Sequence, residues 1–358
     1  MESLGYKLRL KQRTDVPAWL GWGAPPFTVI AALVVGSTAF IAVGVDPIAA
    51  YTEMFRIALT TPGGLSEVVI RTVPLALAGL AVYLPLKAGL WNIAAEGQIF
   101  IGGIMAAWVG LSVDAPAVVL LPLMIGAGAL AGGVLGLIPG YLRARYDVNE
   151  IIVTLLITFI AIQLNEYAIQ ALQGEFQLHG SARLSDAARF PTFFGTRVHL
   201  GVVFVAIAVV GVYLLVKKTK FGFEIEMVGS NPDVSVQAGI NKERVFIVTM
   251  VLGGIMAGIA GVGEIAGLHG RLQPEFSPGY GFTAIAIALL GQRGPFQVLL
   301  ASAFFGTLFV GGLSLQAVYS INFAVVEILV ALVILFLITS EFFKRFEVDL
   351  ERITEEGS

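Results

Sequence analysis

Long runs of apolar residues recur along the chain and constrain its fold more than any other feature. A helix needs about 20 mostly apolar residues to cross the hydrocarbon core of a bilayer. Of the 358 residues, 57% are hydrophobic and 13% are charged, whereas soluble domains carry roughly 25% charged residues. The sequence therefore predicts an all-α polytopic membrane protein. Runs of sufficient length occupy residues 25–45, 66–86, 117–141, 149–171, 198–216, 245–267, 295–316 and 321–340.

Two further apolar segments are too short to cross a bilayer as regular helices. They run from Ile99 to Leu111 and over residues 281–291. Each is expected to be half of a broken helix that irregular chain continues, which is tolerated only where protein or a water-filled cavity surrounds it. With them the chain has about ten transmembrane segments.

Basic residues near the ends of the segments predict the orientation in the membrane. Lys and Arg favour the cytoplasmic side. They lie before the first segment, within residues 217–244 and after the last segment. Both termini are therefore expected in the cytoplasm. The expected parts are a cytoplasmic lead (1–24), a transmembrane domain (25–340) with repeats at about 65–171 and 245–340, a cytoplasmic loop (about 217–244) and a cytoplasmic tail (341–358).

The two short segments hold equivalent places in the two predicted repeats. Each is the second segment of its repeat, and the repeats start on opposite sides of the membrane, so we expect them to be inverted. No repeat of individual residues is visible. A pair of short, glycine-interrupted segments at equivalent places indicates the pathway of a transporter.

Polar residues open the first short segment, in the stretch GLWNIAAEGQ. Asn92 and Glu96 are four residues apart and share a helix face, and Gln98 follows. Polar groups at membrane depth usually mark pathways. Three interpretations are open: these residues brace or gate a broken helix, they contact substrate, or they lie at the membrane interface.

Aromatic residues flank both short segments. Trp91, Tyr280 and Phe282 have rings that can stack on a flat ligand. Packing within the protein and anchoring at the membrane interface are the alternative roles of such rings. We expect the pathway to lie in this region, without assigning the contact to one ring.

Two carboxylates interrupt apolar runs in the second half of the chain. A buried carboxylate must be paired, hydrogen-bonded or protonated. Glu264 and Glu327 lie in such runs, and Arg71 is a candidate partner for either. A carrier coupled to protons would use such carboxylates as relays, so this interpretation also remains open.

Glycine spacing predicts where helices pack closely. Small residues at four-residue intervals let helix backbones approach each other in a membrane. The expected glycine faces are formed by Gly128, Gly132, Gly136 and Gly140 on one segment and by Gly254 and Gly258 on another.

Several classes of function are disfavoured by what the sequence lacks. There is no GxxxxGK[ST] phosphate-binding loop, no HExxH zinc motif and no cysteine, and the three histidines have no metal-ligand spacing. The net charge of −3 gives no indication of a nucleic-acid partner. No cofactor or metal is expected, and any energy from ATP must come from another subunit.

Three stretches together resemble one family. GLWNIAAEGQ is similar to the G-x-x-N-I-x-x-E-G-Q signature of the inner-membrane permeases of ABC importers for branched-chain amino acids, simple sugars and nucleosides. VGSNPDVSVQAGI resembles that family's G-x-N-P-x-A-A-x-x-x-G-I loop, and GYGFTAIAIALLGQRGP resembles its G-x-G-F-x-x-I-x-x-A-L-L-G-x-x-x-P segment. The resemblance covers about 65–340 and preserves the order of the motifs.

The resemblance implies a transport subunit and not an enzyme. N-I-x-x-E-G-Q is similar to the nucleoside branch, with riboflavin or a simple sugar as alternative ligands within the family. The implied partners are a second permease subunit, cytosolic ABC ATPase subunits and an extracytoplasmic substrate-binding lipoprotein. The chain itself is expected to be a multi-pass protein of the cell membrane. An ion-coupled secondary transporter using Glu264 and Glu327 is the alternative from another class.

The resemblance also assigns a role to the cytoplasmic loop. Gly229, Asn231, Pro232 and Gly239 would lie where the loop contacts the ATPase. Glu226 and Met227 stand where the family often has an Arg-Ala pair. This departure reverses a charge on the expected docking surface, and a complementary change in the ATPase is one explanation.

Overall fold

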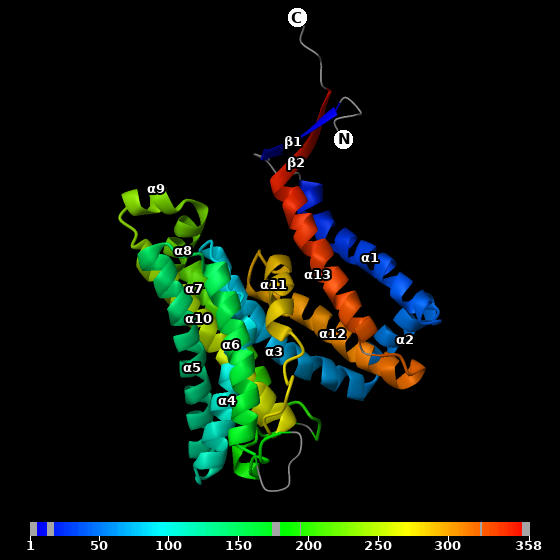
Figure 1. The fold of residues 1–358 in the computed structure, drawn as a ribbon, viewed down its shortest axis with the longest axis vertical. Helices are drawn as coiled ribbons and strands as arrows, with labels where there is room; N and C mark the ends of the chain where they lie inside the picture. The colour runs from blue at the N-terminus through cyan, green and yellow to red at the C-terminus, as the bar shows by residue number, and fades with distance from the viewer. Residues whose placement is uncertain (1–5, 13–17, 174–179, 194, 323, 353–358) are drawn as a thin grey trace, which may run out of the picture. The chain divides into compact units, whose positions relative to one another are not determined.

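The protein is almost entirely helical (Figure 1). The computed structural model describes residues 6–12, 18–173, 180–193, 195–322 and 324–352. Its α-helices are α1 (Ala18–Ala42), α2 (Pro47–Thr60), α3 (Pro62–Lys87), α4 (Ala95–Ser112), α5 (Ala117–Tyr146), α6 (Glu150–Ala171), α7 (Gly201–Lys218), α8 (Lys220–Ser230), α9 (Pro232–Gln237), α10 (Lys242–Val262), α11 (Tyr280–Leu290), α12 (Pro295–Tyr319) and α13 (Ala324–Arg345). The other elements are strands β1 (Tyr6–Gln12) and β2 (Phe346–Arg352), the 3₁₀ helix η2 (Asp186–Ala188) and the π-helical turn η3 (Gly263–His269).

Membrane-length helices confirm the predicted class of an all-α polytopic membrane protein. Within the described residues, six helices are long and apolar enough to cross a bilayer, and a seventh span arises if α1 and α2 are counted together. The six are α3, α5, α6, α7, α10 with η3, and α12. The predicted runs coincide with these helices, with α1 and with α13. Shorter apolar helices, at Tyr280–Leu290 and Ala324–Ser340, add to them.

Helix α2 was not predicted from the sequence. Its residues include Glu53 and Arg56, whose side chains form an ion pair at 2.6 Å on an exposed face. Their polarity keeps this helix out of a search for apolar runs, although a Glu and an Arg three residues apart stabilise a helix. Thr61 then caps α3 by accepting a hydrogen bond from Gly64, and Pro62 follows at the first helical position, as is typical of helix starts.

Each of the two short segments is a helix, and a stretch of irregular chain comes directly before it. Residues 88–94 contain no regular helix before α4, and residues 270–279 contain none before α11. Gly89 and Gly270 have positive φ angles of 81° and 68° at the start of these segments, a conformation that glycine adopts readily. The expectation of interrupted helices at both places is therefore confirmed.

Glycines hold α10 against α5 and α4, and the three helices lie side by side (Figure 1). A Cβ atom at Gly132 would overlap the carbonyl oxygen of Gly254, and one at Gly258 would overlap that of Gly128. A Cβ at Gly102 of α4 would in turn overlap the backbone of Gly258. The predicted glycine faces are thus in backbone contact, which supplies the close packing that associates helices in a bilayer.

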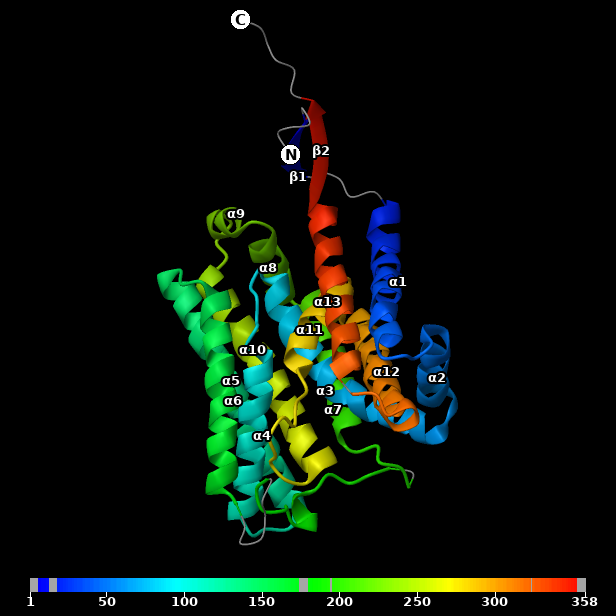
Figure 2. The ribbon, with the colours of Figure 1, turned by 45° about the vertical axis from the view of Figure 1, so that its right-hand side comes forward.

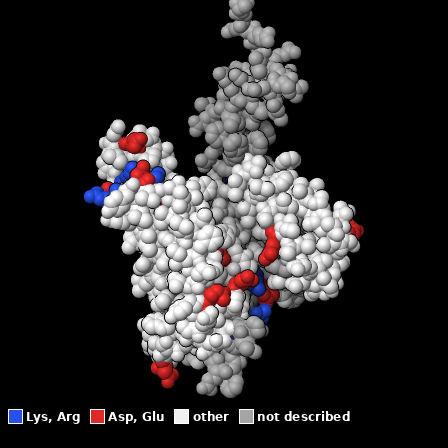
Figure 3. Space-filling model, in the orientation of Figure 1, with Lys and Arg blue, Asp and Glu red and all other residues white. Residues whose placement is uncertain are grey.

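The larger of two compact units, residues 51–318, has a distinct lipid-facing side. Only 28% of the apolar windows of α5, α6 and α7 are buried, against 83% of that of α3. In Figure 3 the sides of α5 and α6 are almost free of charge; one group of charged residues lies at the end that carries α8 and α9, and a second lies near the middle of this face. Helix α3 therefore belongs to the interior of the unit, whereas α5, α6 and α7 face lipid.

The smaller unit, residues 1–50 and 319–358, contains the paired ends of the chain. Helix α1 packs against α13, and β2 continues from α13 to pair antiparallel with β1 (Figure 2). No local pattern predicts this pairing, because the strands lie at opposite ends of the chain. The register sets three basic positions opposite three acidic ones: Lys7 and Glu351, Arg9 and Asp349, and Lys11 and Glu347.

Candidate functional site

The two short helices meet at their N-terminal ends. Helix α11 contacts α4 and α3, and a Cβ atom at Gly281 would overlap the backbone of Glu96. Glycine at this position therefore lets the first turn of α11 lie directly against the first turn of α4. We call the meeting of Ala95–Gln98 with Gly279–Gly281 the helix junction.

Glu96 joins the two helices at this junction. Its side chain is 2% exposed, and its Oε2 accepts a hydrogen bond from the backbone N–H of Gly281 at 2.5 Å. The first N–H groups of a helix have no partner within the helix, and a carboxylate is favoured at the positive end of the helix dipole. Glu96 thus caps α11 from α4, a contact that agrees with the bracing interpretation.

Asn92 and Gln98 form the second polar contact of the broken segment. Both are fully buried, and Asn92 Nδ2 donates to Gln98 Oε1 at 3.0 Å and to the carbonyl oxygen of Ala81 at 3.1 Å. Pro85 has no N–H, so Ala81 lacks its partner within α3. Asn92 therefore satisfies a carbonyl that a proline leaves free inside the membrane domain, where an unpaired carbonyl is costly.

Tyr280 and Arg71 lie on the other side of the junction. Tyr280 is fully buried at the start of α11, and Arg71 Nη1 on α3 donates to its hydroxyl at 2.5 Å. The Tyr280 ring packs edge to face on Phe309, with centroids 5.6 Å apart. Arg71 is thus bonded to a buried hydroxyl inside the larger unit.

Glu264 is paired with a histidine one turn further along the same helix. It is 1% exposed in η3, and its Oε2 lies 3.2 Å from His269 Nε2. His269 Nδ1 lies 2.8 Å from Gln273 Nε2. The widened turn of a π-helix, a feature often found at functional sites, brings the two groups together. His269, and not Arg71, is therefore the direct partner of Glu264.

The remaining sequence candidates lie apart from these contacts. Trp91 is in the irregular segment before α4, where its backbone N–H points to Glu150. Phe282 is 36% exposed on α11, one residue beyond the junction. Glu327 lies in the smaller unit on an exposed part of α13.

Sequence reasoning missed part of the polar set. His269 and Gln273 carry no motif, and only their place beside a glycine-rich break could have indicated them. Phe276 is 1% exposed and stacks edge to face on Phe100, with centroids 4.8 Å apart. No group of three or more potential metal ligands occurs among the residues described.

Residues 217–244, which were predicted to form a cytoplasmic loop, contain two short helices, α8 and α9. Asn231 Oδ1 accepts from the N–H groups of Asp233 and Val234, both at 3.1 Å, and Pro232 opens α9. Gly239 ends this segment with φ of 80°.

Glu226, which stands where the family often has an arginine, has an ion-pair partner within the chain. Its Oε1 lies 2.9 Å from Lys217 Nζ, and both side chains are more than 40% exposed. An exposed pair of this kind contributes little stability. The reversed charge is thus partly neutralised from α7.

His199 gives the larger unit a pH-sensitive group outside its spanning helices. Its ring is 1% exposed, and Nδ1 accepts from the N–H of Gly201 at 3.1 Å. Burial lowers the pKa of His199, an effect that Glu264 opposes and Arg197 reinforces. The neutral ring is therefore the form that the fold accommodates.

We expect stability to decrease as the pH falls below about 6.5, because the unfolded chain then binds a proton that folded His199 resists. The melting temperature of purified protein should fall from about pH 7.5 to about pH 5.5, and His199→Gln should weaken this dependence. An unchanged dependence in the variant would show that other groups control it.

The fold and the junction define the class of protein: a multi-pass membrane protein in which two interrupted helices meet at buried polar residues, as in transporters. Residues 64–339 match the model of the branched-chain amino acid transport system / permease component family, and the chain belongs to this family. It is a permease of the ABC transporter class in the cell membrane.

Three curated relatives extend this family match. A glucose ABC transporter permease of Haloferax volcanii is 49% identical over 97% of this chain and 95% of the relative. A guanosine ABC transporter permease of Bacillus subtilis is 32% identical over 88% and 92%. A nucleoside ABC transporter permease of Lactococcus lactis is 31% identical over 80% and 82%.

Proposed function

We propose that this chain is the permease subunit of an ATP-driven importer for a monosaccharide of the glucose type. The observation that carries the proposal is the 49% identity, over 97% of the chain, to a permease described as a glucose transporter. The chain would move ligand delivered by an extracytoplasmic substrate-binding lipoprotein, together with a second permease subunit and cytosolic ATPase subunits.

Nucleosides are the second candidate. This candidate is supported by the 32% identity to the guanosine permease and by the N-I-x-x-E-G-Q resemblance that contains Asn92, Glu96 and Gln98. The two ligand classes share a ring with several hydroxyl groups, so polar residues near the junction suit either. Riboflavin, the third ligand named by the resemblance, also carries a polyhydroxyl chain.

The arrangement of the short helices supports a pathway at the junction. Helix α3 packs on α11, and α10 packs on α4, which is the exchange of neighbours expected if two inverted repeats are related by a two-fold axis. We place Asn92, Glu96, Gln98, Tyr280 and Glu264 beside this pathway. Trp91 and Phe282 would line its approaches.

The ligand class can be tested with the complete assembly in proteoliposomes that contain its binding protein. We expect ATP-dependent uptake of labelled glucose to exceed uptake of guanosine, adenosine, uridine and riboflavin. Uptake of nucleosides without glucose would replace the first candidate with the second. Uptake of riboflavin alone would contradict both.

The loop of α8 and α9 is proposed as the contact with the ATPase. It lies at the end of the larger unit where charges gather (Figure 3), and the side chains of Val234 and Val236 are 47% and 52% exposed on α9. Basic residues of this end, such as Lys218 and Arg244, favour the cytoplasmic side. Apolar side chains exposed on a polar loop are typical of a protein contact.

A double variant Val234→Asp/Val236→Asp is expected to release the ATPase. Exposed substitutions of this kind change folding stability by about 0.5 kcal/mol or less, whereas burying two carboxylates in an interface opposes association. We expect co-purification of the ATPase with the permease to fall at least about tenfold. Asp233→Asn on the same helix is the control, and retention of the ATPase by the double variant would contradict the proposed contact.

A further inference from the structure

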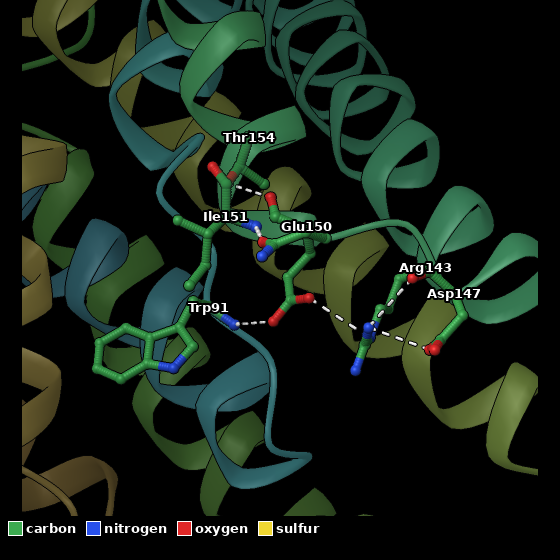
Figure 4. Close-up of polar contacts among 7 residues, drawn as sticks. Trp91, Arg143, Asp147, Glu150, Ile151 and Thr154 are labelled. Carbon is green, nitrogen blue, oxygen red and sulfur yellow. Dashed lines mark hydrogen bonds and ion pairs between the residues drawn. The ribbon is translucent and has the colours of Figure 1, made fainter.

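Helix α6 holds the irregular segment 88–94 at two points. Glu150 Oε1, at the first residue of α6, accepts from the backbone N–H of Trp91 at 3.4 Å, and Thr158 Oγ1 donates to the carbonyl oxygen of Ile93 at 3.2 Å. Figure 4 shows the first of these contacts, with the Glu150 carboxylate between Trp91 and Arg143. The backbone of the segment is therefore fixed by side chains of another helix.

The Glu150 carboxylate is buried and also forms an ion pair. It is 7% exposed, and its Oε2 lies 3.4 Å from Arg143 Nε at the end of α5. Arg143 also contacts the exposed carboxylate of Asp147 at 3.1 Å. A buried carboxylate is costly unless it is paired, and the contacts of Glu150 with Arg143 and Trp91 supply that pairing.

The start of the segment touches α8. A Cβ atom at Gly229, near the end of α8, would overlap the carbonyl oxygen of Lys87, and one at Gly89 would lie 3.7 Å from the Cα of Gly229. Backbone thus meets backbone, with no flexible side chain between α8 and the start of the segment. A displacement of α8 would act directly on residues 87–89.

The same segment leads into the helix junction. Asn92 within it bonds to Ala81 and Gln98, and Glu96 at the start of α4 bonds to Gly281 of α11. Backbone contacts and hydrogen bonds therefore connect α8 to both short helices without a gap. Among the contacts described, Glu150 and Thr158 are the only side chains of α6 that bond to the segment between α8 and the junction.

We propose that Glu150 is a positioning residue for coupled transport. Glu150 fixes the backbone of Trp91 and so keeps segment 88–94 rigid. A rigid segment transmits a displacement of α8 to the helix junction. Without this contact the segment yields locally, and the movement does not reach α4 and α11. The inference rests on the proposed contact between α8–α9 and the ATPase.

Glu150→Gln tests this role when ATP hydrolysis and ligand uptake are measured in the same proteoliposomes. The expected result is an uptake rate at least about tenfold lower, with ATP hydrolysis within about twofold of the wild type, so that more ATP is hydrolysed per ligand moved. Arg143→Gln should also raise the amount of ATP hydrolysed per ligand moved, and it replaces Glu150→Gln in the test if that variant does not assemble. Asp147→Asn, on the same turn but without contact to the segment, should leave the ratio unchanged.

Three outcomes separate the proposals. An unchanged ratio in both Glu150→Gln and Arg143→Gln would overturn the positioning role. A parallel fall of hydrolysis and uptake would show a merely structural role and would overturn it equally. If the wild-type assembly takes up ligand without hydrolysing ATP, the proposed function itself is wrong. The wild-type measurement therefore distinguishes failure of the proposed function from failure of the role of Glu150.

Discussion

Replacing Gly258 by leucine is expected to prevent the larger unit from folding. Gly258 lies where α4, α5 and α10 meet, and a Cβ atom there would overlap the carbonyl oxygen of Gly128. Overpacking of a core costs about 1–3 kcal/mol where side chains can adjust, but here the obstacle is the backbone of α5 at Gly128 and Gly132. We expect almost no correctly folded protein after extraction, as measured by the monodisperse peak in detergent chromatography.

Gly126→Leu is the matched control for this prediction. Gly126 is on α5, and a Cβ atom at this position meets nothing within 4 Å. The control variant should be recovered at close to the wild-type yield. Normal recovery of Gly258→Leu would mean that α5 and α10 do not pack through their glycine faces.

Replacing Glu96 by alanine is expected to abolish transport. The substitution removes the acceptor for the N–H of Gly281 and leaves a buried helix end uncapped, at a cost of about 1–3 kcal/mol. The contact also fixes α11 against α4, so its loss separates the two short helices at the junction. Uptake in proteoliposomes should fall at least about tenfold, which corresponds to about 1.4 kcal/mol.

Glu96→Gln separates the hydrogen bond from the charge. The amide oxygen of glutamine can still accept from Gly281, so this variant should retain more activity than Glu96→Ala. Equal activity of Glu96→Ala and the wild type would contradict the bracing role. Equal loss in both variants would show that the charge of Glu96, rather than its hydrogen bond, is required.

Local composition was sufficient to predict the helical spans and the interruptions between them. The apolar runs correspond to α3, α5, α6, α7, α10 and α12 because a helix that crosses the bilayer must be apolar along its length, whether lipid or other helices surround it. Helix α2 escaped detection because Glu53 and Arg56 make its surface polar. Glycine spacing likewise predicted which helix faces pack closely, but only the structure shows that the faces of α5 and α10 pack against each other.

Contacts between distant residues were beyond sequence reasoning. Glu96 was recognised as unusual, but its partner is a backbone N–H on a helix that begins far along the chain, and a backbone group has no signature. The same holds for Asn92, whose partner is the carbonyl of Ala81 that Pro85 leaves unpaired. Arg71 was a candidate partner of Glu264, yet it bonds to Tyr280, because the π-helical turn places His269 nearer to that carboxylate.

We propose that import through this permease is driven by ATP hydrolysis on a partner subunit. The decisive measurement is uptake of labelled glucose by proteoliposomes that contain the complete assembly and its binding protein, with and without ATP. We predict uptake with ATP and none without it, and none by this chain alone. Uptake by this chain alone under a proton gradient would contradict the account and would indicate an ion-coupled carrier.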